Sequence, residues 1–215
     1  MIELDVETYP TVTKEDAHMK RVEWVLILTA LVIAFSIAIA GDLIEVKNLK
    51  AKSGKPYKVA EKSLDVGDVY YIDRQYTIVS MPDELKGGTW IMTANDDKHS
   101  KGEDFLTFEV TQSVTVYILH DSRGEEEKGG TPPEWLSKNF EKVEDWKVEV
   151  TDANMGWFNV WKADFPKGEI KIGGNDDPPA AGHGSNYVVV LSPSRGAPVE
   201  SHGKLPTTWG EIKAR

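Results

Sequence analysis

The stretch that decides the fold is DFLTFEVTQSVTVYILHD, residues Asp104–Asp121. It contains two alternating runs around a short polar break, and their apolar members are Leu106, Phe108 and Val110, then Val114, Val116 and Ile118. Successive side chains of a β-strand point to opposite faces of the sheet, so each run places its apolar residues on one face. The stretch therefore predicts two strands, each with one buried face.

Similar short segments follow one another from Leu64 onwards, separated by Gly, Pro, Asn and Asp. Many short strands with turn signals between them are typical of a β-sandwich or a β-barrel. One helix is predicted, over Pro133–Asn139, because proline is favoured at the start of a helix. The further predicted strands are Val69–Ile72, Tyr76–Ser80, Thr89–Ala94, Lys147–Thr151, Trp157–Lys162, Glu169–Ile172 and Asn186–Leu191.

The composition excludes several classes of protein. The chain of 215 residues carries a net charge of −10, and an acidic surface argues against binding to nucleic acid, which needs a basic footprint. The sequence has no cysteine, so thiol catalysis, cysteine-based zinc sites and disulfides are ruled out. Apolar residues make up 40% of the chain, enough for a hydrophobic core.

The N-terminal region indicates export. Residues Val25–Ala40 are apolar or small and uncharged, they follow the basic Met19-Lys20-Arg21, and they end in Ala38-Ile39-Ala40. This is the pattern of a signal peptide over residues 19–40, cleaved after Ala40. A membrane-spanning helix usually needs about 20 apolar residues, so the run is short for one. We expect a secreted or cell-envelope protein.

A single-pass membrane anchor is the alternative, in which the segment is not cleaved and residues 1–18 are cytoplasmic. Contact with a membrane is expected only through such an uncleaved segment. Residues 1–18 are acidic and polar, which is unusual before a signal peptide, so we interpret them as an upstream extension and Met19 as the true start. The remaining regions are expected to be a linker with a first strand near Leu43–Lys47 (41–63), the β-sandwich domain (64–192) and a flexible tail (193–215).

A set of six short pieces occurs in order between Leu64 and Leu191. They are VGDVYYIDRQYTIVSMP (66–82), TANDDK (93–98), VTVYILHDSR (114–123), PPEWL (132–136), FNVWKADFPKGEIKIGGN (158–175) and SNYVVVL (185–191). Together they resemble a jelly-roll-like β-sandwich module that recurs in secreted multidomain bacterial proteins, often beside polysaccharide-degrading or adhesive domains. The resemblance implies an antiparallel jelly-roll-like fold and an accessory role, without naming a ligand.

Trp157, Asn159 and Trp161 are candidate ligand-binding residues. Their spacing puts them on one face of a strand, with the two indoles about 13 Å apart. Flat aromatic rings with an amide between them suit stacking on sugars and hydrogen bonding to a hydroxyl. The alternative is that this face belongs to the core and that Phe158 and Val160 point outward. Both faces carry apolar residues, so the sequence leaves the choice open.

Acidic residues in the loops are candidate metal ligands. Carboxylates from separate loops could bind calcium if the loops converge, although no calcium-loop motif is present. An ion-pair network that includes Arg123 would explain Asp97 and Asp121 equally well. His99 and His183 show no metal-like spacing. The candidate calcium ligands are Asp96, Asp97, Asp121 and Asp176.

The sequence offers no believable combination of base, nucleophile and stabilising group, so we do not expect an enzyme. The leading hypothesis is a non-catalytic secreted binding module, for carbohydrate, with a polysaccharide as its partner. The alternative is a structural or adhesive cell-surface domain that binds a surface protein. No cofactor is expected other than calcium.

Overall fold

The computed structural model describes residues 43–125 and 129–194. The predicted upstream extension, the signal or anchor segment and nearly all of the predicted tail lie outside the described residues. Within the two described ranges, no helix is both long and apolar enough to cross a membrane.

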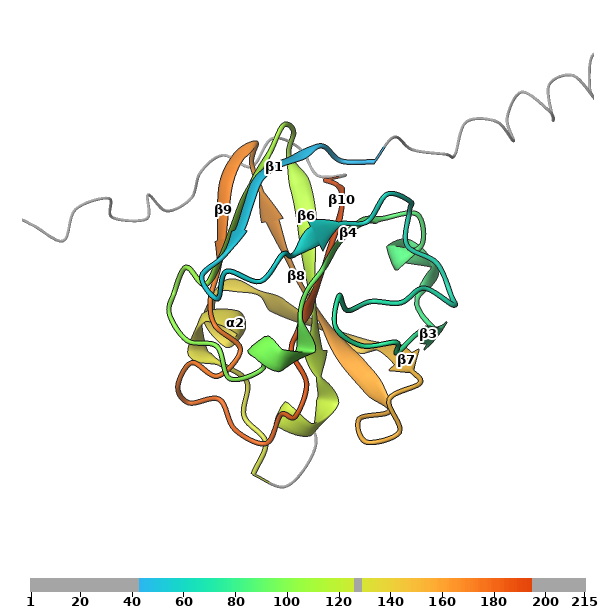
Figure 1. Ribbon diagram of the computed structural model, residues 1–215, viewed down its shortest axis with the longest axis vertical. Helices are drawn as coiled ribbons and strands as arrows, with labels where there is room; N and C mark the ends of the chain where they lie inside the picture. The colour runs from blue at the N-terminus through green and yellow to red at the C-terminus, as the bar shows by residue number, and fades with distance from the viewer. Residues whose placement is uncertain (1–42, 126–128, 195–215) are drawn as a thin grey trace, which may run out of the picture. The chain divides into compact units, whose positions relative to one another are not determined.

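The described residues form short strands with one α-helix and three turns of 3-10 helix (Figure 1). The helix is α2 (Glu134–Asn139), as the sequence predicts, and the turns are η1 (Asp83–Leu85), η2 (Asn95–Asp97) and η3 (Ser122–Gly124). The strands are β1 (Val46–Ala51), β2 (Lys58–Val59), β3 (Ile78–Ser80), β4 (Thr89–Met92), β5 (Leu106–Val110), β6 (Val114–Asp121), β7 (Glu141–Val150), β8 (Trp157–Phe165), β9 (Gly168–Ile172) and β10 (Val188–Pro193).

These strands build two sheets. The smaller sheet has the order β1-β5-β9, and the larger has the order β2-β4-β10-β6-β8-β7-β3. Every pair of neighbouring strands in the two sheets is antiparallel. The fold class predicted from the sequence, an antiparallel β-sandwich with one short helix, is therefore confirmed.

The main core lies between the two sheets. The smaller sheet contributes Leu106, Phe108 and Ile170, and the larger sheet contributes Val116 and Ile118, all of them fully buried. The alternating residues of β5 and β6 face this core, as their spacing predicts. Burial of apolar area at roughly 25 cal/mol per Å² makes this layer the principal source of stability.

A second apolar cluster covers the other face of the larger sheet. Phe158 and Val160 of β8 pack there with Tyr70 and Tyr71 from the segment that precedes β3. Trp161 of the same strand belongs to the main core instead. Strand β8 is therefore buried on both faces, which is why its sequence shows no simple alternation of apolar and polar residues.

Residues 43–63, which the sequence assigned to a linker with a first strand, contribute to both sheets. Strand β1 pairs with β5, and β2 pairs with β4. Ile44 and Tyr57 are buried in the main core. The sequence placed the start of the sandwich at Leu64. In the structure the sandwich begins earlier and includes β1 and β2.

Antiparallel pairing collects three long loops at one end of the sandwich. Val188 at the start of β10 pairs with Leu119 near the end of β6, and Ile172 at the end of β9 pairs with Leu106 at the start of β5. The loops after β4 (93–105), β6 (122–125 and 129–133) and β9 (173–187) consequently lie together, in the lower part of Figure 1, and we call this the loop end.

Candidate functional site

The three predicted ligand residues lie on β8, which begins at the loop end. Trp161 and Asn159 are buried, with exposed fractions of 8% and 2%. Trp157, at the start of the strand, is partly exposed. Its indole Nε1 donates a hydrogen bond of 3.3 Å to Asn159 Oδ1, and Lys147 Nζ lies 4.5 Å from the ring centroid. Trp157 is thus the least buried member of the set.

The buried part of this set is organised by Glu125, whose side chain is only 4% exposed. Trp161 Nε1 and Asn159 Nδ2 donate hydrogen bonds of 2.9 and 3.0 Å to its carboxylate. Lys142 Nζ lies 3.1 Å from the same carboxylate, and His120 Nδ1 lies 2.7 Å from it. Four polar groups from β6, β7 and β8 therefore converge on one carboxylate, which orients Trp161 toward the interior.

The environment keeps Glu125 ionised. Burial by itself would raise the pKa of its carboxyl, but hydrogen bonds from His120 and Trp161 outweigh burial and lower the pKa. Sequence reasoning missed this residue, because Glu125 stands in the charged run GEEEKGG, which is typical of a solvated loop. No local signal distinguishes it, since its role depends on side chains from three other segments.

Two of the four candidate calcium ligands, Asp96 and Asp97, lie in η2 and contact other side chains of the chain. Asp97 is buried and accepts hydrogen bonds from Ser53 (2.6 Å), Lys55 (2.6 Å) and Tyr57 (2.9 Å). Asp96 is exposed and forms an ion pair with Arg74 of 2.5 Å. Both carboxylates therefore tie η2 to neighbouring segments.

The third candidate, Asp121, is fully buried at the end of β6. Its carboxylate forms a two-point ion pair with Arg123, with distances of 3.0 Å to Nε and 2.7 Å to Nη2. It also accepts hydrogen bonds of 2.8 Å from the amides of Gly184 and Ser185. Asp121 thereby joins the loop after β6 to the loop after β9, in the ion-pair arrangement that was the alternative to calcium.

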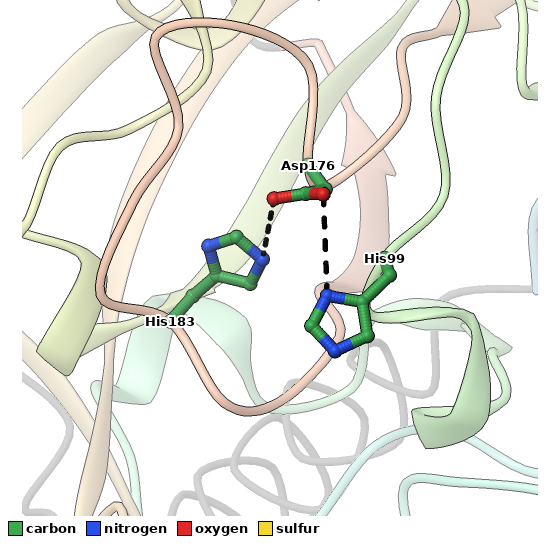
Figure 2. A group of neighbouring side chains, drawn as sticks. All are labelled: His99, Asp176 and His183. Atoms are coloured by element: carbon green, nitrogen blue, oxygen red, sulfur yellow. Dashed lines mark ion pairs between the residues drawn. The ribbon is translucent and has the colours of Figure 1, made fainter.

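Asp176, the fourth candidate, lies between two histidines (Figure 2). His183 Nε2 is 3.4 Å from Asp176 Oδ1, and His99 Nδ1 is 4.0 Å from Asp176 Oδ2. Burial lowers the pKa of His183, which favours its neutral, ligand-competent form. The potential ligand atoms of His99, Asp176 and His183 all lie within 4.8 Å of one another, so that together they could hold a metal ion. The sequence had set His99 and His183 aside.

Comparison with known proteins agrees with the fold. No family model matches the sequence, and neither does any curated protein. A β-glucuronidase from glycoside hydrolase family 2 is similar in structure, with a TM-score of 0.58 and 22% sequence identity over 68% of this chain. A GH138 enzyme targeting pectin rhamnogalacturonan II gives a TM-score of 0.43 and 10% identity over 69% of this chain. The matches cover 14% and 16% of those two chains. This chain thus spans a small part of the β-glucuronidase.

Proposed function

We propose that this chain is an exported, non-catalytic carbohydrate-binding module and that Trp157 is its sugar-contacting residue. The observation that carries the proposal is the partly exposed indole of Trp157 at the loop end, held by its hydrogen bond to Asn159. An aromatic ring fixed before binding loses little freedom when a sugar stacks on it. The Lys147 ammonium lies over one face of the ring, so the sugar is expected to stack on the opposite face, with Lys147 as a donor at the edge of the site.

The fold supports the same proposal. The structural neighbour with the TM-score of 0.58 is named as a β-glucuronidase, and this chain matches only 14% of it. A small β-sandwich that resembles one part of a sugar-processing enzyme is suited to an accessory role. Fold alone does not define a ligand, so the exposed aromatic residue carries the argument.

We expect no catalytic role for Glu125, the buried carboxylate that accepts a hydrogen bond from Trp161. A general acid or base must reach the proton that it transfers. Glu125 is only 4% exposed, and it is occupied by His120, Lys142 and two hydrogen-bonded side chains of β8. Its position suits support of the tryptophan strand better than chemistry on a substrate.

The test is binding of the full-length protein to an array of polysaccharides that includes neutral and uronic acid-containing glycans. Trp157→Ala should abolish binding and change the melting temperature little. Trp146→Ala is the matched control, because Trp146 is also partly exposed but stacks on Tyr117 at 6.2 Å; it should bind like the wild type. Equal binding by wild type and Trp157→Ala would contradict the proposal.

A surface domain with a protein partner is the second candidate. It is favoured by the burial of Trp161 and Asn159, which leaves one accessible ring where the sequence suggested two. A protein surface can use a single aromatic anchor with a polar rim. An array without any bound glycan would favour this function over carbohydrate binding.

A further inference from the structure

Two loops that are distant in the sequence place three metal-ligating side chains together at the loop end. His99 comes from the loop after β4, and Asp176 and His183 come from the loop after β9 (Figure 2). The backbones of the two loops are joined beside this group, where the Asp176 amide donates a hydrogen bond of 2.9 Å to the Ser100 carbonyl. The group therefore has a defined backbone frame.

One of the two ligand distances already matches a zinc site, and the other is somewhat longer. With ligand bonds of about 2.0–2.1 Å in a tetrahedral site, neighbouring ligand atoms lie about 3.3 Å apart. His183 Nε2 and Asp176 Oδ1 are 3.4 Å apart. His99 Nδ1 is 4.0 Å from the other carboxylate oxygen, and its side chain is 67% exposed. Because this ring is exposed, it can rotate and bring Nδ1 within ligand distance of a zinc ion held by His183 and Asp176.

The type of donor selects the metal. Two imidazole nitrogens and one carboxylate oxygen suit zinc and similar transition-metal ions. Calcium prefers six to eight oxygen ligands, so a site with two nitrogens disfavours it. The sequence had proposed calcium for Asp176 on the basis of its carboxylate alone.

The Nε2 atom of His183 is held in position for a ligand role by the fold around it. Its side chain is only 3% exposed, and its Nε2 points at the Asp176 carboxylate (Figure 2). The other ring nitrogen, Nδ1, is on the side of the ring away from Asp176 (Figure 2) and is not a proposed ligand atom. Two neighbouring groups now contact these ligands. The Lys98 carbonyl lies 3.1 Å from Nε2, and Lys101 Nζ lies 3.6 Å from Asp176 Oδ2. A metal ion would replace both contacts.

We propose that His99, Asp176 and His183 bind one Zn²⁺ ion, with water at the remaining position. The ion fastens the loop after β4 to the loop after β9 and stabilises the loop end. This site is separate from the sugar-binding role of Trp157, so either proposal can fail without the other.

The experiment is isothermal titration of Zn²⁺ into the full-length protein after treatment with a chelator, together with thermal melting. The wild type should bind one equivalent with a dissociation constant in the micromolar range or tighter. Its melting temperature should rise with zinc, since an ion that binds only the folded state stabilises it. Calcium and magnesium should produce neither effect.

Variants locate the site. His99→Ala and Asp176→Asn should each weaken zinc binding by about tenfold or more, the scale of losing part of a metal site. Because His99 is exposed, the His99→Ala variant without metal should melt at the same temperature as the wild type. Lys101→Ala is the matched control: it removes a competing cation beside Asp176 and should bind zinc at least as tightly as the wild type.

Three results would overturn the proposal: no zinc binding by the wild type, equal binding by wild type and His99→Ala, or a loss in Lys101→Ala as large as that in His99→Ala. If His183→Ala does not fold, His99→Ala and Asp176→Asn still decide the question, because both side chains are partly or largely exposed.

Discussion

Replacing Trp161 by alanine tests whether the buried tryptophan organises the sandwich. The indole is 8% exposed, and it stands opposite Ile118 on one side and Lys142 on the other. Truncating a buried tryptophan to alanine costs about 3–5 kcal/mol through lost burial and the cavity that remains. The Glu125 carboxylate would also lose the donor at 2.9 Å, so we expect a value toward the upper end of that range.

The assay is urea unfolding of wild type and Trp161→Ala, followed by far-UV circular dichroism. A loss of about 4 kcal/mol corresponds to a fall in melting temperature of roughly 8–16 °C for a domain of this size. Trp161→Phe keeps an aromatic ring but removes part of the indole and the hydrogen bond to Glu125. The lost hydrogen bond should cost about 1–3 kcal/mol, with a further cost for the smaller ring.

Trp157→Ala provides the control in the same strand. Its indole is partly exposed, so its loss of stability should be much smaller than that of Trp161→Ala. The reasoning would be refuted if Trp161→Ala cost less than about 1 kcal/mol with an unchanged urea dependence. It would also fail if the two alanine variants were equally destabilised.

Two further predictions concern acid stability and export. Burial would raise the pKa of Asp121, but hydrogen bonds from Arg123 and the Gly184 amide lower it below its usual value. The ionised carboxylate therefore stabilises the fold above the unfolded pKa of about 3.9, and this contribution is lost as pH falls through the lower folded pKa. Asp121→Asn should be less stable than the wild type at neutral pH, and it should lose less stability on acidification. Unfolding experiments at several pH values measure both effects. Protein recovered from the periplasm or medium should begin at Gly41 on N-terminal sequencing, and an intact segment before Val25 would favour the membrane anchor.

The sequence predicted the fold class because several of its strands have one clear apolar face. Leu106, Phe108 and Val110 alternate with polar residues, and they are buried together between the two sheets. The same is true of Val114, Val116 and Ile118 in β6. The short helix was also predictable, since a proline, Pro133, directly precedes it. These features depend on local spacing alone.

The facing of β8 could not be predicted. Both of its faces are covered, by the main core on the side of Trp161 and by the second cluster on the side of Phe158. A strand buried on both faces has no alternation that distinguishes inside from outside. The polar Glu125, which settles how Trp161 is oriented, comes from a separate loop.

The sequence by itself determined that this chain forms an antiparallel sandwich, that it lacks cysteine chemistry, and that its loops are rich in carboxylates. Only the tertiary structure decided what those carboxylates contact. Antiparallel register brings the loops after β4, β6 and β9 to one end, where Asp121 meets Arg123 and Asp176 meets two histidines. Spacing along the chain reports neighbours within one strand or helix, whereas His99 and His183 become neighbours only because the sheets pair their distant strands.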